Sequence, residues 1–88
     1  MMFIHLSHTD LDGYGCQFLT KEYFKEGLFF NANYGLEVKL CLAKILVEIT
    51  NNLEEEIFFL ISDLNLTYNE SKQLNCDITK LNENGAKI

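Results

Sequence analysis

The stretch that decides the fold is Ile57-Phe58-Phe59-Leu60-Ile61-Ser62, at residues 57–62. Five apolar side chains follow one another there without the alternation of a half-exposed strand. Such a run is typical of a central strand in a parallel sheet, because that strand is buried on both faces. Residues 2–6 and 28–31 have similar character and predict two further strands upstream.

Helical segments separate these strands. We expect the first helix at residues 14–26, with Asp12 as its N-cap and Gly27 as its stop. The second is expected at about residues 36–52, with Asn33 as its cap. Its apolar residues recur at helical spacing, which predicts one buried stripe made of Val38, Leu42, Ile45, Leu46 and Ile49.

A third helix is predicted downstream of residues 57–62. Thr67, with Glu70 three positions later, matches a capping box, and Asn84-Gly85 marks the end of that helix. Strands that alternate with helices predict an α/β fold, a parallel sheet of three to four strands with flanking helices. Residues 86–88 resemble the start of a fourth strand, so we expect an incomplete Rossmann-like domain.

The charge and cysteine content of the chain limit the classes of function that it can have. The formal net charge is −6, and the seven basic residues are all lysines. A nucleic-acid-binding surface normally needs a basic patch with arginines, so we expect none in this segment. Three widely spaced cysteines indicate reduced thiols and a cytoplasmic protein. Neither a signal peptide nor a membrane span is expected from the apolar runs.

Candidate metal ligands lie where the strands end. His8, Asp10 and Asp12 follow strand 2–6 at every second position, so in an extended chain they share one face. Asp63 directly follows strand 57–62. If the two strands pair, as in the flavodoxin-like order, four ligands converge, which is enough to begin a site for two cations roughly 4 Å apart.

Turns and helix caps offer an alternative explanation for some of these candidate metal ligands. Asp12 before Gly13 suits a turn or a cap, and Asp63 suits a turn equally well. His5, in the middle of a strand, is expected in the core or on the sheet surface without a functional role. Residues 31–35 could line the rim of the site or simply form a turn.

The motifs resemble a known family. Ser-His-Thr-Asp-Leu-Asp-Gly-Tyr-Gly, at residues 7–15, resembles the first motif of the DHH phosphoesterases, the superfamily of the RecJ exonuclease and small oligoribonucleases. Ile61-Ser62-Asp63 fits the second motif. The third motif, Asp-His-His, would follow the strand that begins at Ala86. By this resemblance, residues 1–88 are the truncated N-terminal part of a DHH catalytic domain.

The resemblance implies a manganese-dependent hydrolase that acts on nucleotides or short oligonucleotides, with Mg²⁺ as a possible substitute. His8 and Asp10 would hold one Mn²⁺, Asp12 the other, and Asp63 would bridge the two. No catalytic residue separate from these ligands is implied. The isolated chain is expected to show weak activity or none, because the third motif is absent.

Two alternatives stay open. Asp-Leu-Asp-Gly after a strand also resembles haloacid-dehalogenase-type phosphatases, in which Asp10 would be the nucleophile, Asp12 the general acid/base and Ser62 the second-motif hydroxyl. The other alternative is a catalytically inactive remnant, whose unfinished sheet would expose an edge to aggregation.

Overall fold

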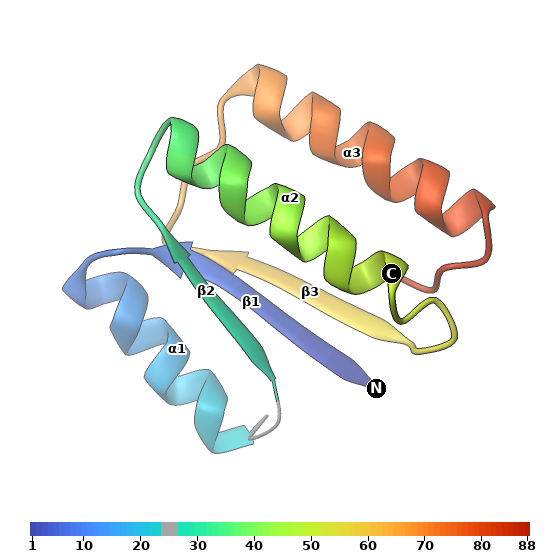
Figure 1. Cartoon of the computed structure of the whole chain (residues 1–88). Coiled ribbons are helices and arrows are strands. Elements are labelled where there is room, and N and C mark those ends of the chain that lie inside the picture. The colour runs from blue at the N-terminus through green and yellow to red at the C-terminus, as the bar shows by residue number, and fades with distance from the viewer. Residues whose placement is uncertain (24–26) are drawn as a thin grey trace.

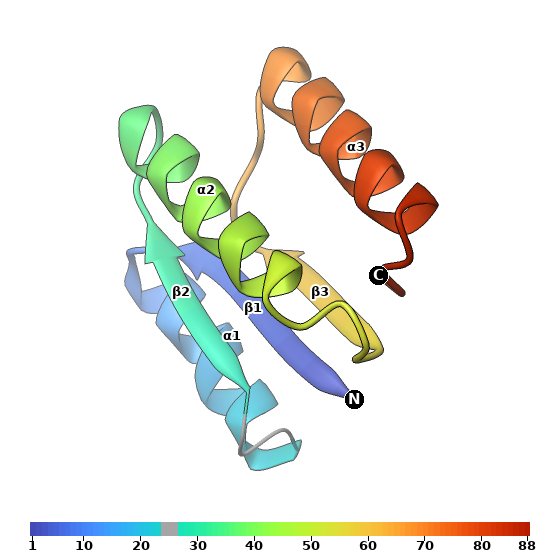
Figure 2. The same ribbon diagram turned by 45° about the vertical axis from the view of Figure 1, so that its right-hand side comes forward.

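A computed structural model describes residues 1–23 and 27–88. Strands and helices alternate along it in the order β1 (Met2–His8), α1 (Leu11–Tyr23), β2 (Leu28–Ala32), α2 (Leu36–Thr50), β3 (Ile57–Ser62) and α3 (Tyr68–Glu83). The strands form one parallel sheet in the order β2-β1-β3. Helix α1 covers one face of the sheet, and α2 and α3 lie on the other (Figures 1 and 2). The predicted α/β fold and the pairing of the first and third strands are confirmed.

The central strand is β1, so the prediction that residues 57–62 occupy the centre is wrong. β1 extends two residues further than expected, and all five residues from Phe3 to Ser7 are buried. β3 has the predicted bounds, but it lies at one side of the three-stranded sheet, where Phe58 is 51% exposed. Beyond it, a single parallel bridge joins Glu56 to Lys87, as expected for the first residues of a further strand.

The starts of the first two helices also differ from prediction. α1 begins at Leu11 rather than Tyr14, because the Asp10 carboxylate accepts a hydrogen bond from the Gly13 N–H and so caps the first turn. Asp12 lies inside that turn and is not the N-cap. The predicted end of this helix at Glu26 lies outside the described residues.

Helix α2 begins after Gly35, which has a φ of 85° and offers no side-chain cap. The predicted cap is therefore wrong: Oδ1 of the Asn33 side chain accepts a hydrogen bond from the Tyr34 N–H instead. Four members of the predicted stripe are buried, and Leu46 is half-buried. The four buried residues pack with apolar residues of the strands and form the core between α2 and the sheet.

Helix α3 follows its sequence prediction closely. Thr67 accepts from the Glu70 N–H at 3.1 Å, and the Glu70 carboxylate accepts from the Thr67 N–H at 2.8 Å. The helix closes at Asn84, followed by Gly85 with a φ of 105°. The three cysteines are free thiols. Across residues 1–23 and 27–88, the structure contains no helix with the length and apolar character that a membrane span requires.

Candidate metal centre

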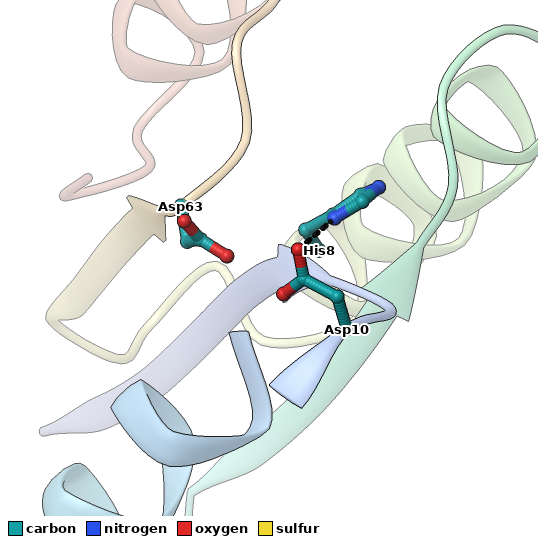
Figure 3. Close-up of side chains that lie close together, drawn as sticks. All are labelled: His8, Asp10 and Asp63. Atoms are coloured by element: carbon teal, nitrogen blue, oxygen red, sulfur yellow. Dashed lines mark hydrogen bonds and ion pairs between the residues drawn. The ribbon is translucent and has the colours of Figure 1, made fainter. Parts of the chain in front are cut away.

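Two parallel strands bring the candidate ligands together. Ser7 of β1 pairs with Ser62 of β3, so His8 and Asp63 are the next residues along their strands at the same edge of the sheet. Asp10 follows in the turn between β1 and α1. One ligand atom from each of His8, Asp10 and Asp63 lies within 4.8 Å of the others (Figure 3). The sequence prediction of convergence is met for these three residues.

Asp63 adopts an unusual backbone conformation. Its φ is 52°, and among the described residues it is the one non-glycine residue with a positive φ. The left-handed region costs an L-residue about 1 kcal/mol, although aspartate tolerates it better than most residues. Directly after β3, this conformation leaves the Asp63 carboxylate facing Asp10 (Figure 3).

Asp10 uses both carboxylate oxygens. Oδ1 accepts from the Gly13 N–H at 2.7 Å, and Oδ2 accepts from Nδ1 of His8 at 2.7 Å. The Gly13 hydrogen bond is the main reason why the pKa of Asp10 falls to about 2, and the bond from His8 adds to the effect. Asp10 is therefore ionised at neutral pH.

His8 is held from both sides of its ring. Its Nδ1 donates to Asp10, and its Nε2 lies 3.2 Å from the Asn33 side-chain oxygen. The Tyr34 ring lies beside it, with centroids 4.7 Å apart. The Asp10 hydrogen bond, followed by that of Asn33, raises the pKa of His8. Residues 33 and 34 thus line the rim of the site, a possibility that the sequence alone left undecided.

The two carboxylates of the cluster oppose each other. The pKa of Asp63 is raised, first by its interaction with the carboxyl group of Asp10, then by partial desolvation and by the charges of Asp10 and Asp12. Within residues 1–23 and 27–88, the one salt bridge that either clustered carboxylate makes is between Asp10 and His8. A cation placed among these oxygens would relieve the repulsion.

Asp12 stands apart from the three-residue cluster. The expectation that it shares a face with His8 and Asp10 assumed an extended chain, and this is wrong because the chain is helical from Leu11 onward. Its charge still reaches Asp63. A ligand role for Asp12 stays a prediction.

The structure places His5 in the core, one of the two positions expected for it, but sequence reasoning missed the polar contacts that it makes beneath the site. His5 is fully buried, with Nδ1 2.9 Å from Oγ1 of Thr20 and Nε2 2.6 Å from Oγ of Ser62. Desolvation lowers the pKa of His5, so its ring is neutral at pH 7. The sequence did carry a signal: His5 and Ser7 are polar residues at i and i+2 in an otherwise apolar strand, and so lie on one face.

The alternative phosphatase arrangement receives no support from this geometry. The Ser62 hydroxyl is bonded to His5 in the interior rather than to the carboxylate cluster.

Comparisons with known proteins find similar proteins in Helicobacter pylori. No family model matches the chain. A Helicobacter pylori protein named 3′,5′-cyclic-nucleotide phosphodiesterase is 49% identical over 74 residues, which are 84% of this chain and 21% of that protein. The crystal structure of an uncharacterized protein from Helicobacter pylori G27 is 43% identical, with a TM-score of 0.92 over the whole of this chain and 26% of its own. The chain therefore spans about a fifth to a quarter of the proteins that it matches.

Proposed function

We propose that residues 1–88 are the N-terminal part of the catalytic domain of a DHH-type phosphoesterase, which hydrolyses phosphodiester bonds in nucleotides or short oligonucleotides with divalent metal ions. The observation that carries the proposal is the cluster of His8, Asp10 and Asp63 within 4.8 Å at the carboxyl ends of adjoining parallel strands. In open α/β sheets this edge is where ligands bind. The Helicobacter phosphodiesterase of similar sequence supports the same reaction class.

The donor set fits Mn²⁺. Carboxylate oxygens suit Mg²⁺ and Mn²⁺, and an imidazole nitrogen favours a transition metal over Mg²⁺. The mutual repulsion of Asp10 and Asp63 also favours a bound cation. We assign His8, Asp10 and Asp63 as ligands, with Asp12 contributing to a second ion. When bound, such ions lower the pKa of water and neutralise charge on a phosphoryl group.

The chain's own residues prepare this site. Asp10 is ionised at neutral pH, so this ligand needs no deprotonation when a cation arrives, and the Gly13 N–H binds one of its oxygens. The Asn33 side chain and the Tyr34 ring restrict the rotation of His8. For His8 to bind a metal, its imidazole must be neutral and present one unprotonated ring nitrogen.

Calorimetric titration with Mn²⁺ tests the metal assignment. The wild-type chain is compared with Asp10→Asn and Asp63→Asn, and with Asp77→Asn as a control that removes the same charge on α3. We expect the two site variants to bind at least about 10-fold more weakly, since the loss of mere supporting residues already costs 10–100-fold. Equal binding by all four proteins would refute the assignment.

A second titration tests the substrate class. In the presence of Mn²⁺, 3′,5′-cyclic AMP should bind to the chain and adenosine should not, because only the nucleotide offers phosphoryl oxygens to the metal site. Equal affinity for the two compounds would show that the phosphate is not recognised.

A further inference from the structure

A polar network lies beneath the metal centre, buried between the sheet and α1. His5 and Ser7 of β1 are both fully buried, and Gln17 of α1 is 3% exposed. The network reaches β3 at Ser62, the residue directly before Asp63. No buried side-chain nitrogen or oxygen in the described part of the chain lacks a hydrogen-bond partner. The network is therefore fully satisfied, which favours a single rigid arrangement.

The hydrogen bonds fix the state of the His5 ring. Thr20 donates its hydroxyl proton to the Gln17 carbonyl, so its Oγ1 must accept from Nδ1–H of His5. Nε2 of the neutral ring then has no proton and accepts from the Ser62 hydroxyl at 2.6 Å, a much shorter contact than the 3.4 Å between that hydroxyl and Oγ of Ser7. The network thus runs in one direction, from Ser62 through His5 and Thr20 to the backbone of α1.

Ser62 is bonded a second time, through its backbone. The Ser7 hydroxyl donates to the Ser62 carbonyl oxygen at 2.9 Å. That carbonyl belongs to the peptide unit joining Ser62 to Asp63, and the orientation of this unit limits the directions open to the next residue. Asp63, at a φ of 52°, is the residue that departs from ordinary backbone geometry. Both bonds therefore act where β3 ends and the unusual conformation begins.

We propose that His5 and Ser7 are positioning residues, which hold Ser62 by its hydroxyl and its carbonyl so that Asp63 keeps its left-handed conformation and faces His8 and Asp10. The inference rests on the proposed function, because it gives the Asp63 carboxylate a metal to bind. The two residues touch Ser62 rather than the ligands, so they act through the backbone of Asp63. The position of the Asp63 carboxylate after β3 therefore depends on two buried side chains of β1.

The first test measures Mn²⁺ affinity by calorimetry. Ser7→Ala and Ser62→Ala each remove one hold on Ser62, and Ser62→Thr restores the hydroxyl. Thr20→Val is the matched control, because it removes the other hydrogen bond of His5 and leaves Ser62 bonded. We expect about 10-fold weaker binding for the two alanine variants, with near wild-type binding for Ser62→Thr and Thr20→Val. Equal weakening by Thr20→Val would mean a general loss of stability and would overturn the inference.

Coupling to Asp63 gives a second readout. In an Asp63→Asn background, Ser7→Ala should weaken Mn²⁺ binding much less than in the wild type, because the ligand that it positions is already impaired. A full additional 10-fold loss would show that Ser7 does not act through Asp63.

The third readout needs no metal. Backbone chemical shifts of the isotope-labelled chain report the φ of Asp63, which should leave the left-handed region in Ser7→Ala and Ser62→Ala. An unchanged left-handed Asp63 in both variants would overturn the inference. If φ shifts as expected but the wild-type chain does not bind Mn²⁺, the proposed function fails and the positioning of Asp63 by the network stands.

Discussion

Gly13 and Gly15 offer a matched pair of substitutions on α1. Both are helical, but only Gly13 is buried. A Cβ on Gly13 would overlap the carbonyl oxygen of His8 and lie 2.8 Å from its carbonyl carbon, whereas a Cβ on Gly15 would meet nothing within 4 Å. Glycine at position 13 therefore allows α1 to begin directly against the end of β1.

The magnitudes follow from two opposing effects. Replacing an interior helical glycine by alanine stabilises the helix by about 0.8–1 kcal/mol, and Gly15→Ala should gain this amount. At Gly13 the same gain is opposed by an overpacking cost of about 1–3 kcal/mol. The cost should lie near the upper end, because the opposing atoms are backbone and cannot rotate away. We expect Gly13→Ala to be destabilised by about 2 kcal/mol, roughly 3 kcal/mol below Gly15→Ala.

Urea unfolding followed by circular dichroism measures this difference. In a chain of this size, 1 kcal/mol corresponds to about 4–8 °C in the melting temperature, so the two variants should also separate clearly on heating. Equal stability of Gly13→Ala and Gly15→Ala would refute the close approach of α1 to His8. Stabilisation by both variants would refute it even more directly.

Two further predictions concern single side chains. Thr67→Ala should lower the free energy of unfolding by about 1 kcal/mol, because it removes half of the capping box, whereas Thr50→Ala, which removes only a bond back to the Leu46 carbonyl, should change it little. His5 should make stability depend on pH: burial lowers its pKa below 6.5, so the unfolded chain binds the extra proton and stability falls as the pH drops below 6.5. Comparison with His5→Gln separates this effect from that of His8, which both proteins contain. The difference in unfolding free energy between the two proteins should fall by up to about 1.4 kcal/mol for each pH unit below 6.5. A constant difference from pH 7 to pH 5 would contradict the prediction.

Local sequence signals predicted most of the fold. The bounds of β3 and the capping box at Thr67 depend on residues that are neighbours in sequence, and both are confirmed. The position of β3 in the sheet could not be predicted in this way. An apolar run indicates that a strand is buried, but it does not say which strands or helices lie beside it. The start of α1 was misplaced for a related reason: both Asp10 and Asp12 can cap a helix, and the tight contact between Gly13 and His8 decides between them.

The site was predictable where it depends on strand ends. His8 and Asp63 follow from the rule that parallel strands present their carboxyl ends at one edge, once β1 and β3 are paired. The departure of Asp12 from the cluster was hidden, since alternation along a sequence has meaning only while the chain stays extended. The His5 network was hidden as well, because it joins residues 57 positions apart.

The arrangement of the cluster carries two local costs, which the proposed function would explain together. Asp63 occupies a backbone region unfavourable for L-residues, and its carboxyl group faces the ionised Asp10. A residue with no function at this position could relieve both costs by adopting an extended conformation, or by being replaced with glycine. The rest of the structure works against such relief, because two hydrogen bonds from β1 hold the preceding residue in place. Under the proposed function, a bound cation would turn the repulsion between the two carboxylates into joint coordination, and the held conformation of Asp63 would serve that binding.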